Sequence, residues 1–96
     1  MTPTALFELN GKTALVTGGA TGIGRMATTA LAAAGAQVFI ASRKIDACRA
    51  TADAINSMGF AGSVHAMQGD VATADGIEKL INDLDNQTDK LHILMN

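Results

Sequence analysis

The feature that most constrains the fold is the glycine-rich stretch TGGATGIG, residues 17–24, which joins an apolar segment to a helical pattern. The preceding residues 12–17, KTALVT, are mostly apolar and β-branched, which is typical of a buried parallel strand. Apolar residues then recur at helical spacing until Gly35, which is typical of the end of a helix. The inner stripe of this helix is predicted to consist of Ile23, Met26, Ala27, Ala30, Leu31 and Ala34.

A second strand and a second helix are predicted downstream. Residues 37–42, QVFIAS, form another short apolar run. Cys48, Ala52 and Ile55 then mark one helical face, and the helix is predicted to end near Gly59. On this face Cys48 is interpreted as a small buried side chain and not as a nucleophile or metal ligand.

The same pattern occurs a third time. Residues 64–68 predict a strand, Thr73 a helix N-cap, and residues 91–95, LHILM, a fourth strand. The inner stripe of the third helix is predicted to consist of Ile77, Leu80, Ile81 and Leu84. Strands that alternate with helices, without hairpin signals, predict an α/β fold with right-handed crossovers and a parallel sheet.

Composition and charge exclude several function classes. The chain of 96 residues is 48% hydrophobic with one proline, which favours a packed globular domain. A net charge of −2 with scattered basic residues argues against nucleic acid, and no apolar run is long enough to span a membrane. The single cysteine and the lack of a leader pattern favour the cytoplasm. His65 and His92 are far apart and no Cys/His cluster exists, so no metal site is predicted.

The glycine turn itself predicts a ligand. Where a strand ends and a helix begins, free backbone N–H groups and the helix dipole favour a phosphate. Gly18 would allow the tight turn, Gly22 would let a pyrophosphate approach the main chain, and Gly24 would let the helix pack closely on the sheet. The stretch is therefore predicted to bind a dinucleotide.

The spacing G-x-x-x-G-x-G resembles the TGxxxGIG cofactor loop of the short-chain dehydrogenase/reductase family, and LNGKTALVTGGATGIG resembles the opening of its classical members. Arg43 after the second strand, Asp70-Val71 after the third and LHILMN at the fourth match the family as well. The resemblance implies a Rossmann-type doubly wound sheet with strand order 3-2-1-4. The loop residues that it assigns to the cofactor are Gly18, Thr21, Gly22, Ile23 and Gly24.

The end of the second strand predicts the choice of cofactor. NAD-binding folds usually place an acidic residue there for the ribose 2′-hydroxyl, whereas a basic residue suits a 2′-phosphate. Aligned on the family, Ser42 takes the acidic position and Arg43 the following basic one, so NADP(H) is expected. Thr21 stands where many NADP-using relatives have a basic residue, which leaves discrimination mainly to Arg43, helped by Ser42 and Lys44. The alternative is that Arg43 and Lys44 only form a solvated helix start.

The remaining cofactor contacts are implied by the resemblance. Asp70 would hydrogen-bond the adenine amino group, with Val71 contacting the ring through its backbone. Asn96 matches the first residue of the Asn-Asn-Ala-Gly segment of the family. From local sequence alone, Asp70 could equally be a polar turn residue.

The resemblance further implies hydride transfer between a nicotinamide cofactor and a carbonyl or alcohol substrate. In the family a tyrosine, a lysine and a serine assist this step, and the chain contains no tyrosine. No catalytic residue is therefore assigned: residues 1–96 are expected to be the NADP(H)-binding portion of a longer enzyme, inactive alone. The segment SRKIDACRATADAI resembles members that act on 3-oxoacyl-type ketones, with steroid, sugar and polyol substrates left open.

A different function class remains open. The chain could be a non-catalytic nucleotide-binding module or regulatory fragment that pairs an exposed sheet edge with another chain. For the full-length enzyme the resemblance implies a homo-oligomer, either a dimer or a tetramer.

Overall fold

The computed structural model describes residues 9–18, 22–70, 73–87 and 92–95. Its elements are β1 (Thr13–Thr17), α2 (Gly22–Ala33), β2 (Gln37–Ser42), α3 (Ile45–Asn56), β3 (Ser63–Gln68), α4 (Ala74–Gln87) and β4 (Ile93–Met95). The first three strands end where the sequence predicts and begin within one residue of the predicted starts. The fourth strand begins at Ile93, and Leu91 lies outside the described residues.

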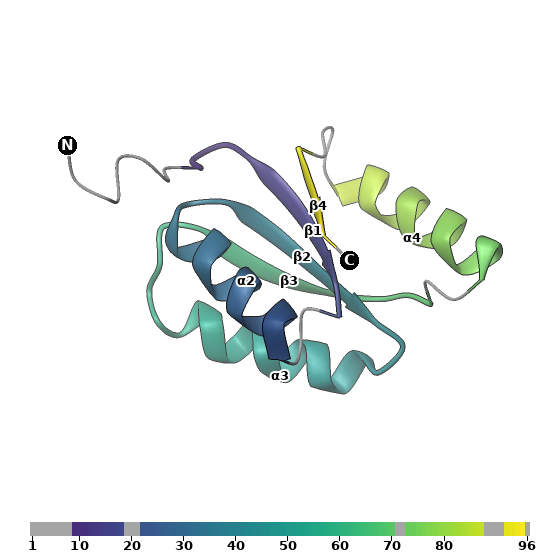
Figure 1. The fold of residues 1–96 in the computed structure, drawn as a ribbon, viewed down its shortest axis with the longest axis horizontal. Coiled ribbons are helices and arrows are strands. Elements are labelled where there is room, and N and C mark those ends of the chain that lie inside the picture. Colours follow the sequence, from purple (N-terminus) through teal and green to yellow (C-terminus); the bar gives the residue numbers. More distant parts are fainter. Residues whose placement is uncertain (1–8, 19–21, 71–72, 88–91, 96) are drawn as a thin grey trace.

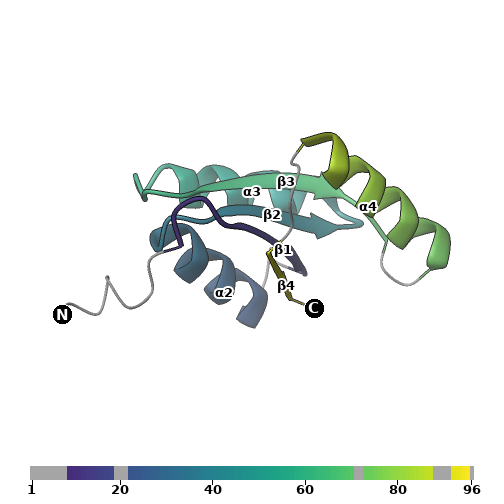
Figure 2. The same ribbon diagram turned by 90° about the horizontal axis from the view of Figure 1, so that it is seen from above.

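The four strands form one parallel sheet with the order β3-β2-β1-β4, which confirms the predicted order (Figure 2). His92, directly before β4, joins it to β1. The His92 N–H donates to the Thr13 carbonyl oxygen at 2.9 Å, and the Thr13 N–H donates to His92 Nδ1 at 3.0 Å. His92 thus has a structural role at the start of a strand.

Side chains alternate between the two faces of the sheet, as extended strands require. Val16, Val38, Ile40 and Val64 belong to a cluster on the face covered by α2 and α3, which lie side by side in Figure 1. Leu15, Phe39 and Met67 belong to a second cluster with Leu80 and Leu84 of α4. Because both faces of the sheet are covered, the central strands β1 and β2 consist almost entirely of buried residues.

The predicted inner stripe of α2 is wrong in part. Ile23 and Met26 are 82% and 72% exposed, whereas Thr28 and Ala32 are buried against the sheet. Thr28 can be buried because its hydroxyl donates to the Gly24 carbonyl oxygen at 2.8 Å. The helix carries apolar residues on two sides, and it packs through the side with the smaller side chains.

The helix α4 also buries less than predicted. Leu80 and Leu84 are buried, but Ile77 and Ile81 are 42% and 50% exposed. Contact with the sheet runs along a single row of residues four apart, which leaves the flanking isoleucines outside it. The predicted N-cap is confirmed, because Thr73 Oγ1 accepts a hydrogen bond from the Gly76 N–H at 3.0 Å.

The outer edge of β3 is covered at one point by a side chain of α3. Asn56 Nδ2 donates to the Val64 carbonyl oxygen at 2.8 Å, and the Val64 N–H donates to Asn56 Oδ1 at 2.8 Å. The amide of Asn56 therefore takes the place that a residue of a neighbouring strand would occupy.

Candidate functional site

The candidate site lies where β1, β2 and β3 end, because parallel strands bring their carboxyl ends to one edge (Figure 2). Backbone hydrogen bonds join the turns that follow these strands. The Gly18 N–H donates to the Ala41 carbonyl oxygen at 3.0 Å, and the Gly69 N–H donates to the Ser42 carbonyl oxygen at 3.1 Å. The three turns thus form one continuous edge.

The described glycines that flank the turn both have left-handed backbone conformations, as the sequence predicts for Gly18. Gly18 has φ of 71° and Gly22 has φ of 56°, which L side chains rarely adopt. A Cβ at either position would meet nothing within 4 Å, so the conformation rather than the available space requires glycine.

The first turn of α2 fits a phosphate. Gly22, Ile23 and Gly24 open the helix, and no acidic side chain lies in this first turn as the structure describes it. The side chain of Ile23 is exposed. Among the described residues, the first turn of α2 thus carries no negative charge that would repel an anion. Thr21 lies outside the described residues.

The turn between β2 and α3 is held by Ser42, while its cations lie in solvent. Ser42 Oγ accepts a hydrogen bond from the Lys44 N–H at 3.1 Å, and the Lys44 carbonyl oxygen accepts the Cys48 N–H at 3.3 Å. Gln68 Nε2 donates to the Arg43 carbonyl oxygen at 3.5 Å, which ties this turn to the end of β3. Arg43 and Lys44 are exposed, so both charged groups can meet a ligand.

Arg43 and Asp70 line a common pocket of about 310 Å³ at this edge. Ser42 and Lys44 belong to the adjoining turn but do not line it. Sequence reasoning missed the remaining lining residues, which are Gln68, Gly69, Gly76 and Lys79. Gly76 and Lys79 line the pocket because α4 folds back on the turn after β3. No local sequence pattern predicts this packing of α4. Val71 and Asn96 lie outside the described residues.

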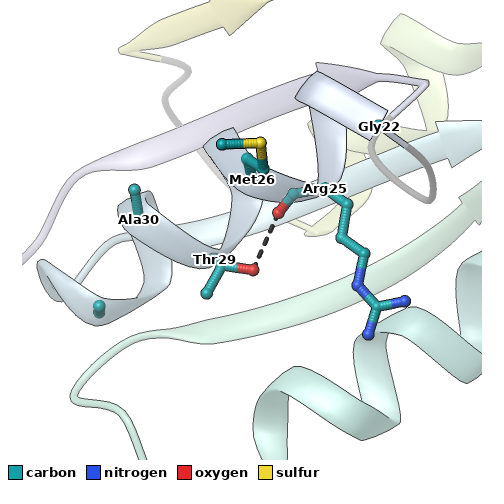
Figure 3. Close-up of a pocket in the computed structure, with 6 residues that line it drawn as sticks. Gly22, Arg25, Met26, Thr29 and Ala30 are labelled. Carbon is teal, nitrogen blue, oxygen red and sulfur yellow. Dashed lines mark hydrogen bonds between the residues drawn. The ribbon is translucent and has the colours of Figure 1, made fainter.

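A second hollow, of about 420 Å³, lies on the exposed side of α2. Figure 3 shows Met26 and Ala30 along it, with the Arg25 side chain extending away from Met26. The Thr29 hydroxyl donates to the Arg25 carbonyl oxygen at 2.9 Å. Gly22 is the one predicted cofactor residue that lines this hollow, and no residue lines both the hollow and the pocket at Arg43.

Cys48 is fully buried beneath the β2–α3 turn, as predicted. Burial raises the pKa of its thiol, and a side-chain hydrogen bond with Ser42 opposes that rise. The thiol is therefore protonated at neutral pH, which does not suit a nucleophile.

The described part of the chain has neither a cluster of metal ligands nor a helix that could cross a membrane. No group of three or more His, Cys, Asp or Glu residues there is arranged to hold a metal ion. None of its helices has the length and apolar character that crossing a membrane requires.

Comparison with known proteins places this geometry in a family. The sequence profile of the family described as short chain dehydrogenase matches residues 12–96. A rhamnolipid-biosynthesis 3-oxoacyl-[acyl-carrier-protein] reductase of Pseudomonas aeruginosa is 39% identical over 90 residues, which cover 94% of this chain and 34% of the reductase. A sorbitol dehydrogenase of Cereibacter sphaeroides is 38% identical, over 94% of this chain and 33% of that protein.

The fold has a close solved counterpart. The Pseudomonas aeruginosa RhlG/NADP active-site complex superposes with a TM-score of 0.85 at 38% identity, over 98% of this chain and 35% of that one. The chain thus spans about a third of the length of the relatives that it matches.

Proposed function

This chain belongs to the short chain dehydrogenase family, and we propose on that basis that it forms the NADP(H)-binding part of an oxidoreductase. The reaction would transfer hydride between the cofactor and the carbonyl or alcohol group of a small molecule. The observation that carries the choice of cofactor is the pocket that Arg43 and Asp70 both line, at the ends of β2 and β3. A guanidinium at this place suits a 2′-phosphate, and an acidic residue would suit a free 2′-hydroxyl.

The proposed binding residues would hold different parts of the cofactor. Backbone N–H groups of the turn with Gly18, Gly22 and Gly24 would hold the pyrophosphate. Arg43, helped by Ser42 and Lys44, would hold the 2′-phosphate, and Thr21 would contact the cofactor as part of the glycine loop. Asp70 would accept a hydrogen bond from the adenine amino group.

The other proposed contacts follow from the family. Val71 and Ile23 would contact the cofactor, and Asn96 would do so after β4. The bound cofactor supplies the hydride or accepts it. The residues of this chain bind and orient that cofactor, and none is assigned to proton transfer.

As substrate we propose a 3-oxoacyl thioester or a similar ketone. The support is the Pseudomonas aeruginosa reductase, whose name gives that activity. The sorbitol dehydrogenase, at nearly the same identity, makes a polyol the competing substrate. Oxidation of NADPH by the intact protein with a 3-oxoacyl thioester, and not with a ketose, would support the thioester. The reverse preference would contradict it.

We also propose that residues 1–96 form one cofactor-binding portion of a longer chain, acting as a dimer or tetramer in the cytoplasm. The short share of each relative that the chain covers supports the first point. An intact mass measured under denaturing conditions tests it. A mass near 9.8 kDa would instead favour a non-catalytic nucleotide-binding module.

The cofactor proposal predicts the effect of Arg43→Ala. A charge-assisted hydrogen bond contributes about 1.5–3 kcal/mol, so the Kd for NADPH should rise roughly ten- to a hundredfold. The Kd for NADH should stay within about twofold, because NADH lacks the 2′-phosphate. Titration of the intact protein by cofactor fluorescence measures both constants.

The matched control is Arg49→Ala. Arg49 is exposed on α3 and does not line the pocket, so its loss removes the same charge without the contact. Its effect on either cofactor should be small. Equal weakening of NADPH and NADH by Arg43→Ala would contradict the assignment.

A further inference from the structure

The pocket at the end of β2 is lined by a second cationic side chain besides Arg43. Arg43 approaches it from the β2–α3 turn and Lys79 from α4, and both side chains are exposed. Neither forms an ion pair with any residue in the part of the chain that the structure describes. One carboxylate, that of Asp70, lines the same pocket, so the charged side chains there are two cations and one anion. Such a hollow attracts a further negative group.

Lys79 is held beside the pocket by the packing of α4. Its neighbour Leu80 is buried and lies so close to Gly69 that a Cβ on that glycine would come within 2.9 Å of the leucine side chain. One turn earlier, a Cβ on Gly76 would overlap the Asp70 carbonyl oxygen. The backbone of α4 is therefore packed directly on the turn after β3. The exposed side chain of Lys79 extends from this fixed backbone.

We propose that Lys79 is a second specificity-determining residue, which favours the 2′-phosphate of NADP(H) from the same pocket that Arg43 lines. This inference rests on the proposed function. A lysine acts as a point charge without the planar fork of arginine, so its contribution is the smaller of the two. Loss of the charge should weaken NADPH binding about three- to tenfold.

Three parts of the cofactor could lie near Lys79: the pyrophosphate, the adenine ring and the 2′-phosphate. The pyrophosphate is assigned to the glycine turn, and Gly18 and Gly22 do not line this pocket. The adenine ring is neutral, so a cation beside it would not distinguish NADPH from NADH. The 2′-phosphate is the one group of the cofactor that differs between the two.

The test measures Kd for NADPH and NADH with Lys79→Gln in the intact protein, at low and at physiological salt. Glutamine has nearly the helix propensity of lysine, so α4 should keep its stability, which a thermal melt checks. The expected result is a three- to tenfold rise for NADPH, at most a twofold rise for NADH, and a weaker salt dependence for NADPH. Lys79→Arg should restore the preference.

The matched control is Lys12→Gln, which removes the same charge from an exposed side chain before β1, at the opposite edge of the sheet. It should change neither constant. Equal weakening of both cofactors by Lys79→Gln, or no change, overturns the inference. If Arg43→Ala alone changes the NADPH preference, only the role of Lys79 fails. If neither variant changes it, the NADP(H) proposal fails as well.

Discussion

Ser42 connects three parts of the candidate site through separate hydrogen bonds. Its carbonyl oxygen accepts from the Gly69 N–H, its hydroxyl oxygen accepts from the Lys44 N–H, and its side chain also bonds the Cys48 thiol. Ser42 thus shapes the turn that carries Arg43.

The buried thiol of Cys48 predicts a loss of stability at alkaline pH. Its pKa in the folded protein is raised above the ordinary value of 9.0, chiefly by burial. A thiol of this kind contributes stability that is fully present below the pKa of the unfolded chain and is lost as pH rises through the folded pKa. The free energy of unfolding should therefore fall above about pH 9 by more in the wild type than in Cys48→Ser.

Urea unfolding at pH 7.5 and at several values above pH 9 measures this difference. Cys48→Ser is the control for the wild type. Its serine keeps a hydrogen-bonding group beside Ser42 but does not ionise in this pH range. A constant gap between the two proteins across the whole pH range would contradict the prediction.

At the scale of single elements, Thr73 predicts the stability of α4. Its hydroxyl oxygen satisfies the Gly76 N–H, one of the backbone donors that a helix leaves free at its start. Thr73→Ala should lower the free energy of unfolding by about 1 kcal/mol, whereas Thr73→Ser should cost only a few tenths. Denaturant unfolding of the three proteins measures both values, and an equal loss for the two variants would mean that the cap is unimportant.

The elements themselves could be predicted from the sequence better than the faces they bury. Each strand is a short apolar run between turn residues, so periodicity and glycine locate it without tertiary information. The helix α2 is different, because Ile23 and Met26 on one side compete with Thr28 and Ala32 on the other. Only the fit against the sheet decides between them. The polar Thr28 is buried because its hydroxyl bonds within its own helix, which an apolar pattern does not reveal.

The candidate site was predictable to the extent that it depends on strand ends. Gly18 has the expected left-handed conformation, and Arg43 and Asp70 line one pocket because β2 and β3 are neighbours. Lys79 could not be predicted in this way. Its position depends on how α4 packs against Gly69, which is a contact between backbone and side chain that leaves no periodic signal.

At the scale of the whole molecule, the two clusters share one set of strands. Ile40 faces α2 and α3, and its neighbour Phe39 faces α4, so both sides of β2 are buried. Ile40→Ala should lower the free energy of unfolding by about 2–5 kcal/mol, because the dense packing around it cannot fill the cavity. Met58→Ala, at an exposed residue after α3, should change it by less than about 0.5 kcal/mol.

Urea unfolding followed both by circular dichroism and by cofactor binding tests this prediction. Both probes should shift together, because the binding edge is formed by the same strands. Loss of binding at a lower urea concentration than loss of secondary structure would show that the edge unfolds independently of the sheet.

The pair of hydrogen bonds between Asn56 and Val64 has a consequence for encounters between molecules. A free strand edge offers its N–H and C=O groups to any extended chain that approaches, and such pairing is a common start of aggregation. In β3 the amide of Asn56 already occupies the donor and acceptor of Val64, near the start of that edge. An approaching strand would first have to displace this side chain. A single asparagine therefore makes this edge a poorer template for fibril growth.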